Sequence, residues 1–346
     1  MLIIGHAVVR DMLAGRELAL IDQVREAYRA HHDGDTAVPK SSFLRFPGNA
    51  RDRIIALPAY LGGGQPAAGI KWISSFPENI HSGMARASGA IILNSLRTGR
   101  PTVLVEGSLI SMKRTAASAA LAAGLLVPDP APSGVGLIGC GVINLEVLRF
   151  LAARFPDLGE VALYDIDPVR VGAFAERCRQ AIPGARVYAA GGPAEALARH
   201  RLVSIATTAS TPHLDLRTCP PATVVLHLSL RDIEPATIIG HRNVVDDADH
   251  VCREGTSLHL AERVTGDRRF INASIGELIQ GTATVRPGPD KMVIFSPFGL
   301  GVLDIALAHY VSVAAQAAGR GTPVPDFLPG TAEPVTPVTP IAAQSG

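Results

Sequence analysis

The sequence predicts an α/β fold in which a doubly wound parallel sheet is joined to a second, α+β domain. Before residue 107, short β-rich runs separated by Gly-, Pro- and Asn-rich turns recur at hairpin spacing, at residues 41–46, 53–57, 69–74, 89–94 and 102–106. From residue 134 onward, apolar strands alternate with helical segments, which is typical of a parallel sheet with helices on both faces. The proline-rich segment Val127–Ser133 lies between these regions and predicts a domain boundary.

The periodicity of apolar residues gives the individual elements and the expected domain limits. Helices are predicted over residues 17–32, 108–126, 142–154, 168–181 and 302–318. Further strands are predicted at residues 134–139, 160–165, 202–207, 223–229, 243–246 and 292–295. Because the last helix is expected to return to the first domain, one domain should comprise residues 1–127 and 303–320, and the other residues 131–302. The Pro- and Thr-rich segment 321–346 is expected to be mostly disordered.

Composition excludes several classes of protein. The chain has 346 residues, enough for two domains of about 150 residues each, and 47% of them are hydrophobic. The formal net charge of +1 gives no electrostatic reason to bind nucleic acid or an anionic membrane. No run approaches the ~20 apolar residues of a membrane span, and the N-terminal segment lacks the pattern of a secretory signal. Four separated cysteines without a C-x-x-C pair indicate reduced thiols in a cytoplasmic protein and no metal cluster.

The strongest local signal is a glycine-rich turn between a predicted strand and a predicted helix. The strand runs into Gly139-Cys140-Gly141, and Val142-Ile143 open the helix. Gly139 allows the tight turn, and Gly141 lets the backbone approach a pyrophosphate at the helix N-terminus, where free N–H groups and the helix dipole favour an anion. The usual third glycine is replaced by Asn144, a departure that weakens the motif.

An acid at the end of the next strand strengthens the dinucleotide interpretation. Asp165 follows Asn144 by 21 residues, close to the ~20 expected of a carboxylate that binds ribose hydroxyls. This carboxylate would repel a 2′-phosphate, so the pattern favours NAD over NADP. The alternative is that Asp165 and Asp167 only begin the next helix; we assign that capping role to Asp167, which precedes Pro168. The turn and the acid together predict a Rossmann-type domain that binds NAD.

Polar residues at two further strand ends are expected to face the same ligand. Thr207 and Thr208 end one predicted strand, and Ser229 and Asp232 follow another. Ligands of open α/β sheets lie at the carboxyl ends of the strands. We therefore expect Thr207, Thr208 and Ser229 to contact the cofactor and Asp232 to point toward its nicotinamide end. The alternative for Asp232 is a helix N-cap before Ile233.

The first domain supplies three cations in apolar surroundings: Arg45, Lys71 and Arg114. Burying such a charge is costly unless it is paired. Each one alone is better explained as a side chain that reaches to solvent. Jointly they make chemical sense, because an arginine and a lysine can clamp a substrate carboxylate.

On the basis of these residues, the chain resembles the ornithine cyclodeaminase and mu-crystallin family over nearly its whole length from Ile3 to about Ala318. The segments that carry the resemblance are Gly69-Ile70-Lys71-Trp72, Thr98-Gly99-Arg100-Pro101, Arg114-Thr115-Ala116-Ala117-Ser118-Ala119, Gly139-Cys140-Gly141 and Tyr164-Asp165-Ile166-Asp167-Pro168. The resemblance implies that Arg45, Lys71 and Arg114 bind the substrate carboxylate. It also implies that Gly139, Gly141, Asp165 and Thr207 contact NAD, that Asp232 is catalytic, and that the first domains form a homodimer.

One segment resembles a particular subgroup. True ornithine cyclodeaminases have a Gly-Gly-Asp turn where this chain reads Ser229-Leu230-Arg231-Asp232. That variant resembles the N-(2-amino-2-carboxyethyl)-L-glutamate dehydrogenases of 2,3-diaminopropionate biosynthesis, which serve siderophore and peptide-antibiotic pathways. The resemblance implies NAD-dependent cleavage of this amino-acid-derived amine to 2-oxoglutarate and 2,3-diaminopropionate. Asp232 would be the general base, Lys71 would act both in catalysis and in carboxylate binding, and Arg231 would be an extra cation for the substrate carboxylates.

Three alternatives stay open. One is ornithine or another cyclodeaminase, which the altered Asp232 segment disfavours. Another is an alanine- or ketimine-type dehydrogenase. The third is a non-catalytic NAD(H)-binding protein like the lens and hormone-binding members of the family. Retention of the three cations together with Asp232 argues against this last alternative.

Overall fold

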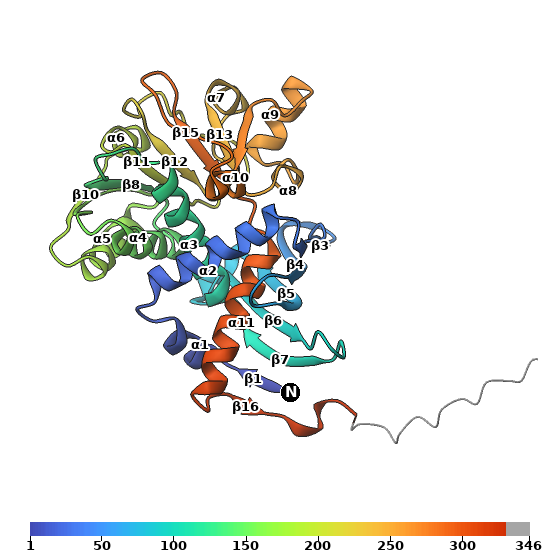
Figure 1. The fold of residues 1–346 in the computed structure, drawn as a ribbon. Coiled ribbons are helices and arrows are strands. Elements are labelled where there is room, and N and C mark those ends of the chain that lie inside the picture. Colours follow the sequence, from blue (N-terminus) through green and yellow to red (C-terminus); the bar gives the residue numbers. More distant parts are fainter. Residues whose placement is uncertain (330–346) are drawn as a thin grey trace, which may run out of the picture.

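The computed structural model describes residues 1–329, which contain two eight-stranded sheets (Figure 1). The first sheet has the spatial order β16 (Thr322–Pro323), β1 (Leu2–Ile4), β7 (Pro101–Glu106), β6 (Ala87–Asn94), β5 (Ala67–Ser75), β4 (Asn49–Leu61) and β2 (Thr36–Ala37), with β3 (Ser42–Phe46) also paired to β4. Its strands from β7 to β2 pair antiparallel, whereas β1 runs parallel to β7. The first sheet is therefore mixed, in agreement with the predicted α+β architecture.

The second sheet is wholly parallel. Its spatial order is β10 (Arg186–Ala189), β9 (Glu160–Tyr164), β8 (Gly134–Ile138), β11 (Leu202–Ile205), β12 (Val224–His227), β15 (Val293–Ser296), β13 (Arg242–Val245) and β14 (Ile271–Ser274). The first five strands have the order 3-2-1-4-5 of a dinucleotide-binding fold, with β8 as its first strand, and β15, the last strand of the sheet along the chain, occupies the sixth position. The central strands β8, β11 and β12 are buried along their whole length, which explains their continuous apolar sequences. The predicted doubly wound sheet is confirmed.

The helices cover the faces of the two sheets. Those of the parallel sheet are α4 (Val142–Arg154), α5 (Pro168–Ala181), α6 (Pro193–Ala198), α7 (Pro235–Gly240), α8 (Ala248–Val251), α9 (Ser257–Thr265) and α10 (Ile275–Gln280). Those beside the mixed sheet are α1 (His6–Leu13), α2 (Glu17–His32), α3 (Ser108–Leu126) and α11 (Gly301–Ala317), together with the short 3-10 helices η1 (Pro77–Ser82) and η2 (Pro325–Phe327). No helix in the described part of the chain is long and apolar enough to cross a membrane.

Helix α11 returns the chain from the parallel sheet to the mixed sheet. It leaves the parallel sheet after β15 and runs back along the mixed sheet, as Figure 1 shows in dark orange. Its buried positions lie on nearly all sides because it is packed between α1, α2, α3 and strands β4 to β7. The helix begins at Gly301, two residues before the predicted domain limit at residue 303. The exact division into two domains remains our prediction.

The expectation of disorder over residues 321–346 is wrong for its first part. Thr322–Pro323 pair with Leu2–Ile3, and the ladder continues as the backbone N–H of Val324 donates to the Met1 carbonyl at 2.7 Å. Backbone hydrogen bonds need no apolar side chain, so a Pro- and Thr-rich composition does not reveal this edge strand. Residues 330–346 lie outside the described residues.

Candidate active site

The glycine turn after β8 has the shape that a pyrophosphate requires. Gly139 has a φ of 96°, and a Cβ there would collide with the Ala206 carbonyl. A Cβ at Gly141 would meet nothing within 4 Å, so this residue leaves open space at the N-terminus of α4. The first glycine is required by the fold, and the second provides room for a ligand at the positive end of a helix dipole.

Asn144 replaces the third glycine without weakening the turn. Its side chain is fully buried, and its amide donates to the carbonyls of Ile138 at 2.9 Å and Gly139 at 2.7 Å. Its oxygen accepts a hydrogen bond from the Ser204 hydroxyl on β11 at 2.8 Å. Asn144 therefore links the turn to strand β11 by hydrogen bonds. These bonds stabilise the loop in place of the close packing that the third glycine of the motif would allow.

The structure places Asp165 beside this turn. One carboxylate oxygen accepts from the Cys140 N–H at 2.7 Å, and the other accepts from the Asp167 N–H at 3.0 Å. Asp167 caps α5 through Val169, the role predicted for it. Two apolar side chains near the carboxylate are unusually exposed, Ile166 at 90% and Val142 at 55%. An acid for ribose hydroxyls flanked by exposed apolar side chains fits an adenine nucleotide.

Asp232 lies fully buried at the centre of a hydrogen-bond network between β11 and β12. Its carboxylate accepts from the hydroxyls of Thr207 and Ser229 and lies 3.2 Å from Nε2 of His227. The other ring nitrogen of His227 is 3.2 Å from the Ser296 hydroxyl on β15. The structure therefore brings three predicted site residues together and adds two that the sequence analysis missed, His227 and Ser296.

The alternative role of Asp232 as a helix cap is excluded, because α7 begins at Pro235 and its N-cap residue is Glu234. Burial alone would raise the pKa of Asp232, but hydrogen bonds from His227, Ser229 and Thr207 outweigh it and hold the pKa below its ordinary value. The side chain is therefore a carboxylate at neutral pH, with both oxygens in hydrogen bonds to neighbouring groups.

Lys71 and Arg114 meet on a residue that the sequence analysis did not single out, Asp304 of α11. The Lys71 ammonium lies 2.5 Å from one Asp304 oxygen, and Nε of Arg114 lies 3.2 Å from the other. Both cations also donate to the Ser111 hydroxyl, at 3.2 Å and 3.4 Å. Asp304 is fully buried and Lys71 is 2% exposed. Two cations share one buried acid, so the group retains one net positive charge for an anionic ligand.

The surroundings of Lys71 change its proton affinity. Burial is the main cause, opposed by Asp304 and reinforced by the nearby Arg114 charge, and it lowers the pKa of Lys71 to about 8. An amine with this pKa can exchange a proton near neutral pH, whereas an exposed lysine cannot.

Arg45 does not join Lys71 and Arg114. Its guanidinium lies 2.5 Å from the Glu254 carboxylate, and half of the side chain is exposed. Arg231 donates to the backbone carbonyl of Glu254 at 2.7 Å. Glu254 itself has a φ of 54°, a strained conformation for a residue with a side chain. The predicted three-cation clamp is therefore divided into two groups, Lys71–Arg114 on Asp304 and Arg45–Arg231 on Glu254.

The loop between β15 and α11 connects the Asp232 network to the Lys71–Arg114 group. Ser296 contacts His227, and three residues later Gly299 packs against Arg114 with a φ of 93°. A Cβ at Gly299 would come within 2.5 Å of the Arg114 guanidinium. The buried carboxylate of Asp246 accepts from the N–H groups of Phe298 and Gly299 and fixes this loop. The Asp232 network and the Lys71–Arg114 group thus border the same loop at the carboxyl edge of the parallel sheet.

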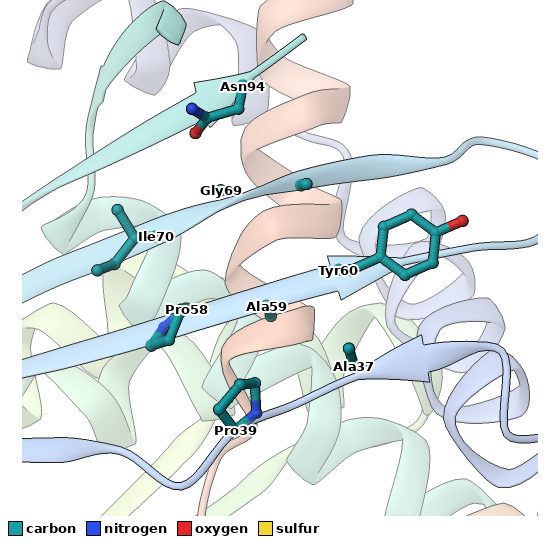
Figure 2. A pocket seen from close by; sticks show the side chains of 9 residues that line it. Ala37, Pro39, Pro58, Ala59, Tyr60, Gly69, Ile70 and Asn94 are labelled. Atoms are coloured by element: carbon teal, nitrogen blue, oxygen red, sulfur yellow. The ribbon is translucent and has the colours of Figure 1, made fainter. Parts of the chain in front are cut away.

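A hollow on the mixed sheet lies elsewhere. Figure 2 shows it on the face turned away from α11, lined by residues of β2, β4, β5 and β6 and of the segment after β2. Its lining residues are Ala37, Pro39, Pro58, Ala59, Tyr60, Ala68, Gly69, Ile70 and Asn94. It holds no charged side chain, and Ile70 lies next to Lys71 in a strand, where neighbours point to opposite faces. This hollow is therefore separate from the Lys71–Arg114 group.

Two buried polar residues that were not among the predicted site residues could have been found from the sequence. Asp304 interrupts the apolar helix GVLDIALAHY, and His227 interrupts the buried strand VVLHLSL. A lone polar residue in such a segment requires a buried partner. Within residues 1–329, no group of three or more His, Cys, Asp or Glu side chains is arranged to hold a metal ion.

Comparison with known proteins identifies the family. The family model for the ornithine cyclodeaminase/mu-crystallin family matches residues 7–319. The chain belongs to this family. The resemblance seen in the glycine turn, the Lys71 strand and the Arg114 helix is therefore confirmed.

Individual family members with a dehydrogenase name match over nearly the whole chain. The N-((2S)-2-amino-2-carboxyethyl)-L-glutamate dehydrogenase of Staphylococcus aureus is 29% identical over 93% of this chain and 97% of its own length. The alanine dehydrogenase of Archaeoglobus fulgidus is 28% identical over 89% of this chain and 93% of its own length. A solved archaeal alanine dehydrogenase dimer with bound NAD has a TM-score of 0.85 at 26% identity, covering 94% of this chain and 99% of that one. The predicted class, an oxidoreductase that uses NAD, is confirmed at the level of this family.

Proposed function

We propose that this family member is an NAD-dependent dehydrogenase that oxidatively cleaves N-(2-amino-2-carboxyethyl)-L-glutamate to 2-oxoglutarate and 2,3-diaminopropionate. The observation that carries the proposal is the presence of two cationic groups, one on Asp304 and one on Glu254. The substrate has three carboxylates, and a monocarboxylic amino acid such as alanine would use only one such group. The Staphylococcus aureus relative bears the name of this activity.

The Lys71–Arg114 group is suited to the carboxylate next to the reacting carbon. Its net positive charge lies in a water-poor position, where a carboxylate gains more than it would in solvent. Holding that carboxylate orients the glutamate α-carbon toward the nicotinamide, which would stand at the carboxyl ends of β11 and β12. Bound NAD+ would accept the hydride from that carbon. The residues assigned to hold it are Gly139, Cys140, Gly141, Val142, Ile143, Asp165, Thr207, Thr208 and Ser229.

The Asp232 network is suited to take a proton. The attack of water on the imine carbon releases one proton, and the resulting carbinolamine breaks its carbon–nitrogen bond to give the oxo acid and the free amine. Because both Asp232 oxygens are bonded to neighbours, the Ser229 or Thr207 hydroxyl would pass the proton to the carboxylate. Asp232 therefore acts as the base through a hydroxyl contact, and His227 supports its charge.

The outer face of the mixed sheet supports the proposed homodimer. Its large apolar side chains Leu44, Tyr60 and Trp72 are 45%, 36% and 46% exposed, and Tyr60 lines the hollow of Figure 2. Exposed apolar patches of this kind mark protein interfaces. The face opposite to Lys71 would thus be covered by the same face of a second copy, in keeping with the dimeric archaeal relative.

The proposal is tested with a substrate panel. NAD+ reduction is followed with N-(2-amino-2-carboxyethyl)-L-glutamate, L-alanine and L-ornithine. The tricarboxylic amine should give a kcat/KM at least ~100-fold above that for L-alanine, because alanine cannot form the charged hydrogen bonds that the second cationic group offers to a further carboxylate. Preferential oxidation of L-alanine would instead favour an alanine dehydrogenase.

Asp165 should determine the choice of cofactor. We expect the protein to prefer NAD+ over NADP+ clearly, because the carboxylate repels a 2′-phosphate. Asp165→Ser should raise the KM for NAD+ and narrow that preference. Comparable use of both cofactors by the unaltered protein would rule out this role for Asp165.

Carboxylate binding should weaken in alkaline solution. Lys71 has a pKa of about 8, so above this pH it loses the charge that attracts a carboxylate. The dissociation constant of 2-oxoglutarate with the NADH complex should rise about tenfold between pH 7 and pH 9. Lys71→Arg should remove this pH dependence because arginine stays charged. An equal rise in both proteins would assign the titration to another group.

A further inference from the structure

An arginine that the proposed function has not used lies beside the Arg45–Glu254 pair. Arg53 of β4 is the cross-strand partner of Arg45. On the same strand, four residues further on, Leu57 is the partner of Lys71, so Arg45, Arg53 and Lys71 share one face of the sheet. Arg53 is half-buried and within electrostatic reach of Arg231, Arg86 and Arg45, with Glu254 as the neighbouring acid.

The other three arginines already have partners in the protein. Arg45 contacts the Glu254 carboxylate, and Arg231 donates to the Glu254 carbonyl. Arg86 donates to the Ser75 hydroxyl at 2.8 Å. The Arg53 guanidinium makes no hydrogen bond or ion pair with any residue of the described range 1–329, and all of its donors are free.

This arrangement has the electrostatics of an anion site. Arg53 lies within electrostatic reach of three other arginines and one acid, and it is half-buried, as are Arg86 and Arg231. Burial, followed by the charges of Arg231, Arg86 and Arg45, lowers the pKa of Arg53. Like charges held together at such a place cost free energy unless an anion compensates them. The Glu254 carboxylate already contacts the Arg45 guanidinium, so a carboxylate is accommodated beside these arginines.

We infer that Arg53 and Arg231 form a second carboxylate subsite, which binds the distal carboxylate of a dicarboxylic amino-acid substrate while Lys71 and Arg114 hold the first. The inference rests on the proposed function in one respect, since the glutamate part of that substrate supplies two carboxylates on one five-carbon chain. Along β4, the Cα atoms at positions 53 and 57 are about 13 Å apart, and long side chains from Arg53 and Lys71 shorten that span. Arg231 adjoins Asp232, so the subsite lies next to the proton-accepting network.

A binding experiment on the NADH complex tests this subsite directly. Dissociation constants are measured by calorimetry for 2-oxoglutarate and for 2-oxovalerate, which has the same chain without the distal carboxylate. Arg53→Gln should weaken 2-oxoglutarate binding by about 10–100-fold, the loss expected for one charged hydrogen bond, and should change 2-oxovalerate binding less than about twofold. Arg53→Lys should restore part of the difference. Arg51→Gln is the matched control, since Arg51 lies on the same strand but is exposed and pairs with Glu78.

The possible results distinguish a failure of the subsite proposal from a failure of the proposed substrate. The inference is overturned if the unaltered protein does not prefer 2-oxoglutarate, or if Arg53→Gln affects both oxo acids alike or neither. If N-(2-amino-2-carboxyethyl)-L-glutamate is not oxidised but the preference persists and depends on Arg53, the subsite stands and serves another dicarboxylic substrate. If that amine is oxidised and Arg53→Gln has no selective effect, the proposed function stands and the subsite is wrong.

Discussion

Replacement of Asp232 by asparagine should lower kcat by about 10²–10⁴-fold, the range expected when a general base is removed. The substitution keeps the shape of the side chain in a fully buried position and removes its charge. Its amide would also place a donor against the Thr207 and Ser229 hydroxyls, which now donate to the carboxylate. The measurement is steady-state turnover with the preferred amine, together with the affinity for NAD+.

Two further readouts distinguish proton transfer from a structural role of Asp232. NAD+ affinity should stay near that of the unaltered protein, and the variant should remain folded, with a temperature of unfolding lowered by its misplaced amide donor. Because the pKa of Asp232 is below its ordinary value, its protonation should not limit activity above about pH 5. An Asp232→Asn protein with nearly full turnover would show that this residue only organises the hydrogen bonds of Thr207, Ser229 and His227.

Replacement of Asp304 by asparagine should give the largest combined loss of stability and carboxylate binding. Removing one partner of a buried ion pair costs about 3–5 kcal/mol of unfolding free energy, since the remaining charge is left uncompensated. Asp304 also raises the pKa of Lys71, so without its charge Lys71 should lose its proton at lower pH. We expect the alkaline loss of 2-oxoglutarate affinity to have its midpoint clearly below pH 8 in this variant, whereas in the unaltered protein the midpoint lies near pH 8.

Glu146→Gln provides a matched control for Asp304→Asn. Glu146 is 4% exposed and pairs with Lys113 at 2.9 Å, between α3 and α4 and outside both cationic groups. This variant should also lose stability, but its affinity for 2-oxoglutarate should keep the pH dependence of the unaltered protein. If Asp304→Asn and Glu146→Gln behave alike in both respects, Asp304 has no role beyond folding.

The local elements of this protein follow closely from its sequence. The predicted helices at residues 17–32 and 108–126 have the same limits in the structure, because their apolar positions recur at helical spacing. The glycine turn and Asp165 lie together because they end neighbouring parallel strands. Patterns within a short stretch of sequence were therefore sufficient to predict where these helices begin and end.

Long-range partners were not predictable in the same way. Arg45 contacts Glu254, which is 209 residues away in the sequence. Glu254 also has a positive φ, which the local sequence does not predict for a glutamate. Asp304 meets Lys71 across 233 residues, although its place in an apolar helix indicated that it needed a partner. The edge strands β10 and β16 were missed because they are largely exposed and their pairing depends on backbone groups.

The most direct test of the central claim follows the hydrogen on the glutamate α-carbon. N-(2-amino-2-carboxyethyl)-L-glutamate carrying deuterium at that carbon is incubated with the protein and NAD+, and all products are measured by mass spectrometry. We predict deuterated NADH, 2-oxoglutarate and 2,3-diaminopropionate in equal amounts, since the imine is hydrolysed before the hydride can return. The account would be contradicted if the labelled amine were not turned over and L-ornithine were instead converted to proline and ammonia without net NADH.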